Sequence, residues 1–301
     1  MNSGTYTPRL QPIDAQTRLA GIMGCPVEHS YSPLIHNTAF DASGLNCRYV
    51  ALPVQPEDLA DAVRGLRALR FLGANVTLPH KQAVLPLLDT LSDTAHAVGA
   101  VNTIVCQHDG DTVILRGDNT DVVGFLEPLR PLGARLHGTG MVILGAGGAA
   151  RAVAYSLLTT YAPECLTLAA RTPARAEQLA ADLASFDTRG ALGVLPLAEA
   201  ARAIRAARLV VNTTPVGMHP QTDATPWPDA RDFHAEQMVY DLIYRPGHTH
   251  LLQQAAAQGA RTVGGLEMLL HQAAAAYRQW TGTPMNLDPV RQAMLAAVFS
   301  E

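Results

Sequence analysis

The sequence predicts an α/β protein of two domains: an α/β domain completed by C-terminal helices, and a Rossmann-type doubly wound domain. The chain has 301 residues, about twice the ~150 residues of an ordinary domain. From residue 141 onward, short apolar strands alternate with helical segments, which is typical of a doubly wound parallel sheet. A glycine-rich loop follows the first of these strands. We expect one domain to comprise 1–121 and 265–301, and the other 122–264.

The first domain is expected to mix strands with helices. Apolar runs bounded by turn residues predict strands, and helical periodicity ended by glycine predicts helices. Asp109-Gly110 is a hairpin signal between two of the strands, and Ser32 before Pro33 is typical of a helix N-cap. The expected strands are 19–23, 47–52, 74–77, 101–106 and 112–116, and the expected helices are 33–43, 57–70 and 79–88.

The second domain is expected to alternate strands and helices, and the chain then ends in two long helices. These helices are expected to pack back on the first domain, because no further strand-helix unit accompanies them. The expected strands are 141–144, 166–170, 209–212 and 238–242, and the expected helices are 149–160, 174–186, 266–280 and 289–299.

The glycine loop predicts a dinucleotide site. Gly145, Gly147 and Gly148 follow a strand and open a helix, and Ala150 replaces the last glycine of the G-x-G-x-x-G pattern, where only close helix-strand packing is needed. A pyrophosphate would lie at the helix N-terminus. The alternative is an ordinary tight turn.

The end of the next strand favours NADP over NAD. An NAD enzyme places a carboxylate there to bind the ribose hydroxyls, but the segment 168–175 has none. Arg171 and Arg175 stand four residues apart and can clamp a 2′-phosphate, while Thr172 before Pro173 suits a helix N-cap. As alternatives, Arg171 is a surface loop charge and Arg175 belongs to a solvated helix face.

Composition excludes several function classes. A net charge of −4 with no run of Lys or Arg argues against nucleic acid and anionic lipid as partners. Residues 1–16 lack the features of a signal peptide, and no apolar stretch approaches membrane-spanning length. We therefore expect a cytoplasmic protein, without a bound metal because no metal-binding motif is present. The cysteines are expected to be reduced and buried: Cys25, Cys47, Cys106 and Cys165.

Lys81 is the single lysine beside 21 arginines. A composition bias toward arginine explains the 21 arginines but not the remaining lysine. Arginine keeps its proton at any working pH, whereas lysine can be tuned to lose it. The sequence therefore indicates proton transfer at Lys81.

The chain resembles the shikimate/quinate dehydrogenase family over nearly its whole length. The resemblance rests on a set of motifs that occur in one order and at fitting distances. They are G-x-P-x-x-H-S-x-S-P (24–33), N-V-T-x-P-x-K (75–81), G-A-V-N-T (99–103), D-N-T-D (118–121), G-A-G-G-A-A-R (145–151), R-T-x-x-R (171–175), V-N-T-T-P-V-G-M (211–218), Y-D-L-I-Y (240–244) and G-G-L-E-M-L-x-x-Q (264–272).

The resemblance implies NADP-dependent, reversible reduction of 3-dehydroshikimate to shikimate. Lys81 would donate or accept the proton, with Asp121 orienting it. The implied substrate-binding residues are Ser30 and Ser32 with Tyr244 for the carboxylate, and Thr77, Asn102, Asp121 and Gln272 for the ring hydroxyls. The implied cofactor-binding residues are Gly145, Ala146, Gly147, Gly148, Ala149, Arg171, Thr172, Arg175, Leu242, Gly265 and Asp93. The main departure is Ala170, where the family commonly has Asn.

The chemistry fits these residue types independently. Reduction of a ring ketone needs a hydride from the nicotinamide and a proton from the protein. Two alternatives stay open: a quinate or aminoshikimate dehydrogenase on the same fold, and a non-catalytic homologue that senses a pathway metabolite. The expected oligomeric state is a monomer or a homodimer.

Overall fold

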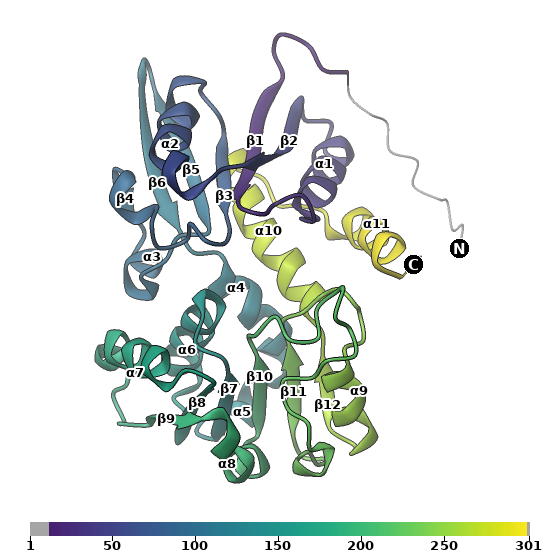
Figure 1. Cartoon of the computed structure of the whole chain (residues 1–301). Helices are drawn as coiled ribbons and strands as arrows, with labels where there is room; N and C mark the ends of the chain where they lie inside the picture. Colours follow the sequence, from purple (N-terminus) through teal and green to yellow (C-terminus); the bar gives the residue numbers. More distant parts are fainter. Residues whose placement is uncertain (1–11, 300–301) are drawn as a thin grey trace. The chain divides into compact units, whose positions relative to one another are not determined.

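The computed structural model describes residues 12–299, which form two compact units (Figure 1). One unit runs up to Thr120 and resumes at Gln272, and the other is Asp121–His271. The first boundary falls one residue earlier than the sequence indicates and the second falls seven residues later, inside a helix. The first eleven residues of the stretch in which no signal peptide is expected lie outside the described residues.

The first unit contains a mixed six-stranded sheet in the order β2-β1-β3-β5-β6-β4. β3 is parallel to β1 and antiparallel to β5, so it is the central strand, and all four of its residues are buried. The elements are β1 (Arg18–Gly24), α1 (Ser32–Ala42), β2 (Cys47–Pro53), α2 (Leu59–Ala68), β3 (Gly73–Val76), β4 (Thr90–Leu91), α3 (Asp93–Val98), β5 (Thr103–Asp109), β6 (Thr112–Asp118), α11 (Leu287–Phe299) and the end of α10 (Gly265–Thr281).

Several expectations for this unit are corrected. Segment 79–88 is not an α-helix, because Pro86 would remove a helical hydrogen bond and clash with the preceding turn; only Leu85–Leu87 forms a short 3₁₀ turn. The expected helix 57–70 begins as a 3₁₀ turn and becomes α2. Ser32 is not the N-cap of α1: the N-cap is Tyr31, and Ser32 is the first residue of the helix. The Ser32 backbone N–H donates to Ser30 Oγ. Asp109-Gly110 does close a β5-β6 hairpin.

The second unit contains a fully parallel sheet in the order β12-β11-β10-β7-β8-β9. When the strands of this unit are numbered in chain order and the sheet is read from β9 to β12, their order is 3-2-1-4-5-6, the doubly wound order of dinucleotide-binding domains. Its elements are α4 (Asp121–Leu126), α5 (Gly133–Leu136), β7 (Gly140–Leu144), α6 (Gly148–Tyr161), β8 (Cys165–Ala170), α7 (Pro173–Asp182), β9 (Leu192–Pro196), α8 (Ala201–Ala206), β10 (Leu209–Asn212), β11 (Met238–Asp241), α9 (His250–Ala257), β12 (Arg261–Val263) and the start of α10.

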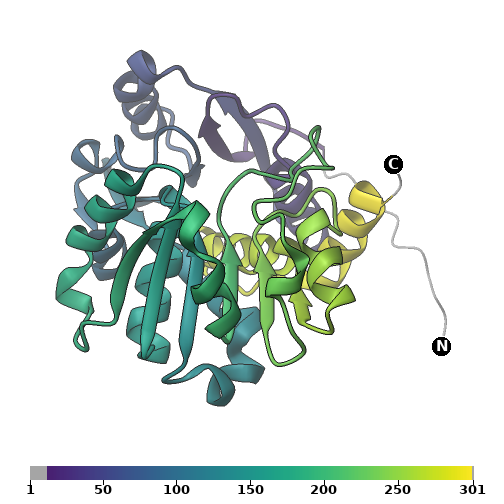
Figure 2. The same cartoon turned by 60° about the horizontal axis from the view of Figure 1, so that its bottom comes forward.

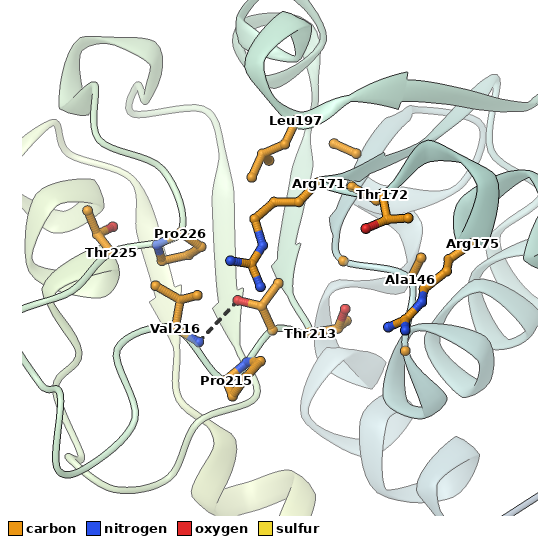
Figure 3. Close-up of a pocket in the computed structure, with 15 residues that line it drawn as sticks. Ala146, Arg171, Thr172, Arg175, Leu197, Thr213, Pro215, Val216, Thr225 and Pro226 are labelled. Atoms are coloured by element: carbon orange, nitrogen blue, oxygen red, sulfur yellow. Dashed lines mark hydrogen bonds between the residues drawn. The ribbon is translucent and has the colours of Figure 1, made fainter.

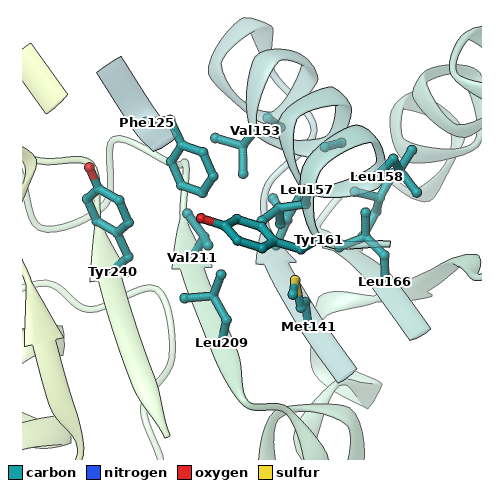
Figure 4. Close-up of a cluster of buried hydrophobic side chains, with 14 of the residues drawn as sticks. Phe125, Met141, Val153, Leu157, Leu158, Tyr161, Leu166, Leu209, Val211 and Tyr240 are labelled. Atoms are coloured by element: carbon teal, nitrogen blue, oxygen red, sulfur yellow. The ribbon is translucent and has the colours of Figure 1, made fainter. Parts of the chain in front are cut away.

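Helices cover both faces of the parallel sheet. Alternate residues of a strand point to opposite faces, so each strand contributes to both helix layers. On one face Met141 and Ile143 pack with residues of α4, α6 and α7. Figure 4 shows Met141 in this cluster with Phe125 of α4 and Val153 of α6. On the other face Val142 and Leu144 pack with residues of α8 and α9. Figure 2 shows the strands of this sheet with the surrounding helices. β7 is thus packed on both faces, and the glycine loop directly follows this buried strand.

Two of the four cysteines and the end of one helix differ from the expectation. Cys165 is exposed and Cys25 is partly exposed, whereas Cys47 and Cys106 are buried as expected. Cys165 is exposed because it is the first residue of β8, at the edge of the core. The expected helix 174–186 ends at Asp182, and a 3₁₀ turn follows.

No described helix is long and apolar enough to cross a membrane.

A buried histidine makes the first unit sensitive to acid. His36 is fully buried, stacks on Tyr49 with ring centroids 4.4 Å apart, and neither of its ring nitrogens has a described hydrogen-bond partner. Burial lowers the pKa of His36 to about 3. The folded state therefore holds His36 neutral, and below the unfolded pKa of 6.5 the unfolded state binds the extra proton.

We expect His36→Phe to flatten the acid dependence of stability. The stabilisation from neutral His36 is present above pH 6.5 and is lost as pH falls toward 3. At pH 5 the wild type should have lost about 2 kcal/mol more of its unfolding free energy than the variant, relative to pH 7. Denaturant unfolding of both proteins at pH 7 and pH 5 measures this difference. An equal loss in both proteins would contradict it.

Candidate functional site

The glycine loop lies where the strand order of the parallel sheet reverses, because β8 and β9 lie on one side of β7, and β10, β11 and β12 lie on the other side. β7 is hydrogen-bonded to β8 on one side and to β10 on the other, so the loop after β7 meets the loops after both neighbours. Gly145 N–H donates to the Ala169 carbonyl at 2.8 Å, and Thr213 N–H donates to the Leu144 carbonyl at 3.0 Å. Ligands of doubly wound sheets bind at this crevice, outside the carboxyl ends of the strands.

A cavity of about 460 Å³ occupies this position (Figure 3). Of the expected cofactor residues it brings together Gly145, Ala146, Gly147, Arg171, Thr172 and Arg175. Figure 3 shows both arginine side chains extending toward the side of the pocket where Ala146 and Thr213 lie. Gly148 and Ala149 do not line the cavity; they are the first two residues of α6. Thr172 precedes α7 as expected, although its side chain makes no capping hydrogen bond.

The remaining wall of the cavity comes from residues that were not assigned from the sequence. After β10, Thr214 and Val216 are joined by a hydrogen bond from Val216 N–H to Thr214 Oγ1, drawn in Figure 3. The signal was present, because these residues belong to the V-N-T-T-P-V-G-M motif that overlaps the end of a parallel strand. The unassigned residues are Ala169, Ala170, Leu197, Thr213, Thr214, Pro215, Val216, Thr225 and Pro226.

The two loop glycines have different physical roles. Gly145 has φ +113°, and a Cβ there would lie 2.7 Å from Thr213 Oγ1. At Gly147 a Cβ would meet no protein atom within 4 Å, although the residue lines the cavity. Gly145 is therefore required by the fold, whereas Gly147 leaves space for a ligand. The arginines, the glycine loop and this open space all fit a phosphorylated dinucleotide.

We expect Gly147→Ala to impair dinucleotide binding without unfolding the protein. Its backbone, φ −95° and ψ −168°, suits alanine, and loss of the N-cap glycine costs at most about 1 kcal/mol. The new methyl group enters the cavity, so the KM for the dinucleotide should rise about tenfold. Gly145→Ala is the matched control, because its strained backbone and clash should lower the melting temperature. Wild-type KM in Gly147→Ala would contradict this assignment.

The expected substrate residues of the first unit gather at one edge of its sheet. Thr77 directly follows β3, and its N–H donates to the Met23 carbonyl at the end of β1. Asn102 directly precedes β5, and its carbonyl accepts from Val76 N–H at 2.8 Å. Because β5 is antiparallel to β3, its first residues lie at the edge where β3 ends. Ser30 lies in the loop that leaves β1 at the same edge.

Lys81 lies in the turn after β3 and is partly buried. Its carbonyl accepts from Val101 N–H at 2.8 Å, which ties the turn to the start of β5. The preceding residue, His80, is buried, and its Nε2 lies 2.7 Å from the Val54 carbonyl. Since a carbonyl only accepts, this nitrogen must carry the proton. Backbone and histidine contacts therefore fix the turn that carries Lys81.

The orientation of the Asn102 amide is set by a buried network. Its Oδ1 accepts from Thr120 N–H at 2.7 Å, from Thr120 Oγ1 at 3.1 Å and from Thr103 Oγ1 at 3.0 Å. The NH₂ end therefore points away from this cluster. Asn75 supports it, because its Nδ2 donates to the Asn102 carbonyl and to Thr103 Oγ1. Thr103, Thr120 and Asn75 were not expected to have this role.

Other expected residues occupy defined places within their own units. In the first unit, Ser32 and Gln272 are buried, and Asp93 is exposed in the first turn of α3. In the second unit, Asp121 is the first residue of α4, and Tyr244 lies in the segment after β11. Gly265 packs against Leu242 so closely that a Cβ would lie 2.1 Å from its carbonyl oxygen. No described group of three or more His, Cys, Asp or Glu side chains could hold a metal ion.

Comparisons with known proteins agree with the geometry. Residues 22–104 match the family model "Shikimate dehydrogenase substrate binding domain", and residues 265–295 match "Shikimate 5'-dehydrogenase C-terminal domain". The chain is 58% identical to a shikimate dehydrogenase (NADP(+)) of Salinibacter ruber, over 95% of this chain and 99% of that one.

Two solved structures are similar to this chain over nearly its whole length. The first is shikimate 5-dehydrogenase from Thermus thermophilus in complex with NADP(H) and shikimate, with 38% identity, a TM-score of 0.81, and coverage of 93% of this chain and 99% of that one. The second is quinate dehydrogenase from Corynebacterium glutamicum in complex with NAD, with 34% identity, a TM-score of 0.85 and the same coverage.

Proposed function

Because the chain belongs to the shikimate dehydrogenase family, we propose that it catalyses the NADP-dependent, reversible reduction of 3-dehydroshikimate to shikimate. The observation that carries the proposal is the cavity at the carboxyl ends of β7, β8 and β10. Arg171, Thr172 and Arg175 line it with the glycine loop, and no described carboxylate does. A 2′-phosphate adds the negative charge that two guanidinium groups bind best.

The cofactor contributes the hydride when it is bound, and the protein's residues supply binding and the proton. Gly145, Ala146 and Gly147 let the backbone approach the pyrophosphate, with Gly148 and Ala149 opening α6 behind it. Leu242, Gly265 and Asp93 complete the proposed cofactor contacts. None of these roles needs a metal ion.

The proposed substrate contacts follow from hydrogen-bonding capacity. Ser30 Oγ accepts from Ser32 N–H, and its hydroxyl proton can then be donated to the substrate carboxylate, together with those of Ser32 and Tyr244. The oriented NH₂ end of Asn102 donates to a ring hydroxyl. Thr77, Gln272 and Asp121 contact the other hydroxyl groups.

Lys81 is the proposed proton donor in reduction and acceptor in oxidation. An ammonium group beside the substrate carbonyl stabilises negative charge as it develops on oxygen and then transfers the proton. Asp121 orients the ammonium group in this proposal. The substrate is a small molecule bound without nucleic acid or membrane, and we propose a cytoplasmic monomer or homodimer.

Absorbance at 340 nm tests the function directly. Purified protein is offered shikimate or quinate with NADP or NAD, in all four combinations. We expect fast reduction of the cofactor only with shikimate and NADP. No turnover in any combination, with ligand binding still detected by thermal shift, would replace the proposal with the metabolite-sensing alternative.

Quinate is the second candidate substrate, because the chain is also similar to a quinate dehydrogenase in complex with NAD. Quinate and shikimate differ little in the ring, so a small change in a pocket can admit either. The arginine pair and the absence of a carboxylate among the described residues of the cavity favour NADP, and with it shikimate. Faster turnover of quinate with NAD would reverse this order.

A further inference from the structure

A buried polar cluster lies directly behind the wall of the cofactor cavity. Asn212 ends β10, Asp241 ends β11, and Thr249 precedes α9; none is more than 1% exposed. Asp241 Oδ1 accepts from Asn212 Nδ2 at 2.9 Å and from Ile243 N–H at 3.1 Å, and Oδ2 accepts from Thr249 Oγ1 at 2.7 Å. Burial raises the pKa of Asp241 to about 6, and these hydrogen bonds keep it from rising further.

The carboxylate determines which way the Asn212 amide faces. An ionised carboxylate only accepts hydrogen bonds, so the NH₂ of Asn212 must point toward Asp241. The amide oxygen therefore points the other way, where it accepts from Thr214 N–H at 2.9 Å and from Thr214 Oγ1 at 2.7 Å. If the amide turned over, Thr214 N–H would lose its acceptor.

Thr214 transmits this orientation to the cavity. It lines the cavity, and its Oγ1 accepts from Val216 N–H, another residue of the wall. The methyl group of Thr214 also lies where a Cβ on Gly145 would be 3.0 Å away, so Thr214 borders the glycine loop. A displacement of Thr214 therefore changes the wall against which a dinucleotide would pack.

We propose that Asp241 is a positioning residue of the cofactor pocket, which acts through Asn212 to hold Thr214 and Val216 in the binding conformation. The inference rests on the proposed function, since it names what sets cofactor affinity at the same site. Asp241 also fixes the segment after β11, because its Oδ1 accepts from Ile243 N–H. The Ile243 carbonyl in turn accepts from Gly265 N–H at 3.1 Å.

Asp241→Asn is the first test. It preserves the shape of the side chain and replaces a carboxylate, which can only accept hydrogen bonds, with an amide, which can also donate them. Asn212 can then face residue 241 with either end. We expect the Kd for NADP⁺, measured by calorimetry, to rise about tenfold, the effect of losing one hydrogen bond to a charged group. The kcat at saturating cofactor should change less than about threefold, since a positioning residue for binding does not touch the reacting atoms.

Thr249→Val is the matched control for general destabilisation. It removes the hydrogen bond to Asp241 Oδ2 and the cap of α9, whose Leu252 N–H donates to Thr249 Oγ1, but leaves the path through Asn212 to Thr214 intact. We expect its melting temperature to fall while its Kd for NADP⁺ stays within about twofold of wild type. A loss of affinity as large as that of Asp241→Asn would overturn the proposal.

The double variant Asn212→Asp with Asp241→Asn tests the route by rescue. The amide now at position 241 can donate to the carboxylate now at position 212, which can still accept from Thr214, although Ile243 N–H loses its acceptor. We expect the double variant to regain NADP⁺ affinity to within about threefold of wild type. Wild-type affinity in Asp241→Asn alone, or no recovery in the double variant, would overturn the proposal.

Hydrogen exchange at the Thr214 amide separates this inference from the proposed function. The measurement uses the free protein, so it needs no cofactor. We expect faster exchange in Asp241→Asn than in wild type or Thr249→Val. If exchange is faster in Asp241→Asn but the wild-type protein binds no NADP⁺, the proposed function is refuted, whereas the inference that Asp241 holds Thr214 in place stands. If exchange is unchanged in Asp241→Asn, the inference that Asp241 holds Thr214 is refuted.

Discussion

Lys81→Met is expected to lower kcat by about 10²–10⁴-fold, the range for loss of a general acid-base group, with a smaller change in KM. Methionine keeps most of the length of the side chain and removes both its charge and its proton. The turn should stay folded, because the Lys81 backbone carbonyl accepts from Val101 N–H and the His80 ring is hydrogen-bonded to the Val54 carbonyl. Steady-state kinetics in both directions measure the effect.

Lys81→Arg distinguishes proton transfer from charge. Arginine keeps the positive charge but does not release its proton at working pH. If the lysine transfers a proton, the arginine variant should also lose most of its kcat; if it only supplies charge, arginine should restore activity. Gln82→Ala is the matched control on the same turn, since that side chain is exposed. Full kcat in Lys81→Met would refute the assignment.

The features predicted correctly from the sequence are those encoded by a few neighbouring residues. The loop Gly145–Gly148 between a strand and a helix, the arginines four residues apart after β8, and the hairpin at Asp109-Gly110 each depend on local geometry. They could therefore be located without knowledge of the tertiary fold. The doubly wound class of the second domain likewise followed from the alternation of strands and helices, although β9 and β12 were not expected and the order of the strands was not predicted.

The features that were missed depend on strands that are distant in the sequence. Thr214 reaches the cavity only because β10 pairs with β7, almost seventy residues earlier in the chain, and the local sequence of neither strand states this pairing. The orientation of Asn102 likewise requires Thr120 and Asn75, which meet it through β3, β5 and β6. The error at 79–88 was local: Pro86 was present in the sequence and should have excluded a continuous helix.

Replacing the arginine pair is expected to abolish the preference for NADP. Arg171→Ala and Arg175→Ala should each raise the KM for NADP about tenfold, and the double variant about a hundredfold, because each removes a charge-assisted hydrogen bond to the 2′-phosphate. The KM for NAD should change less than about twofold, since NAD lacks that phosphate. The ratio of kcat/KM for the two cofactors is the measurement.

Two controls separate specific recognition from a general loss of positive charge. Arg202→Ala on α8 removes the same charge from an exposed position of the same unit that does not line the cavity, and should leave the ratio unchanged. Raising ionic strength should lower the wild-type preference for NADP, because both arginines are exposed and their attraction to phosphate is screened. An equal loss for NADP and NAD would mean that the arginines support the pocket rather than recognise the phosphate. In that case Ala170, which is buried and lines the same cavity, would be the next position at which to look for cofactor discrimination.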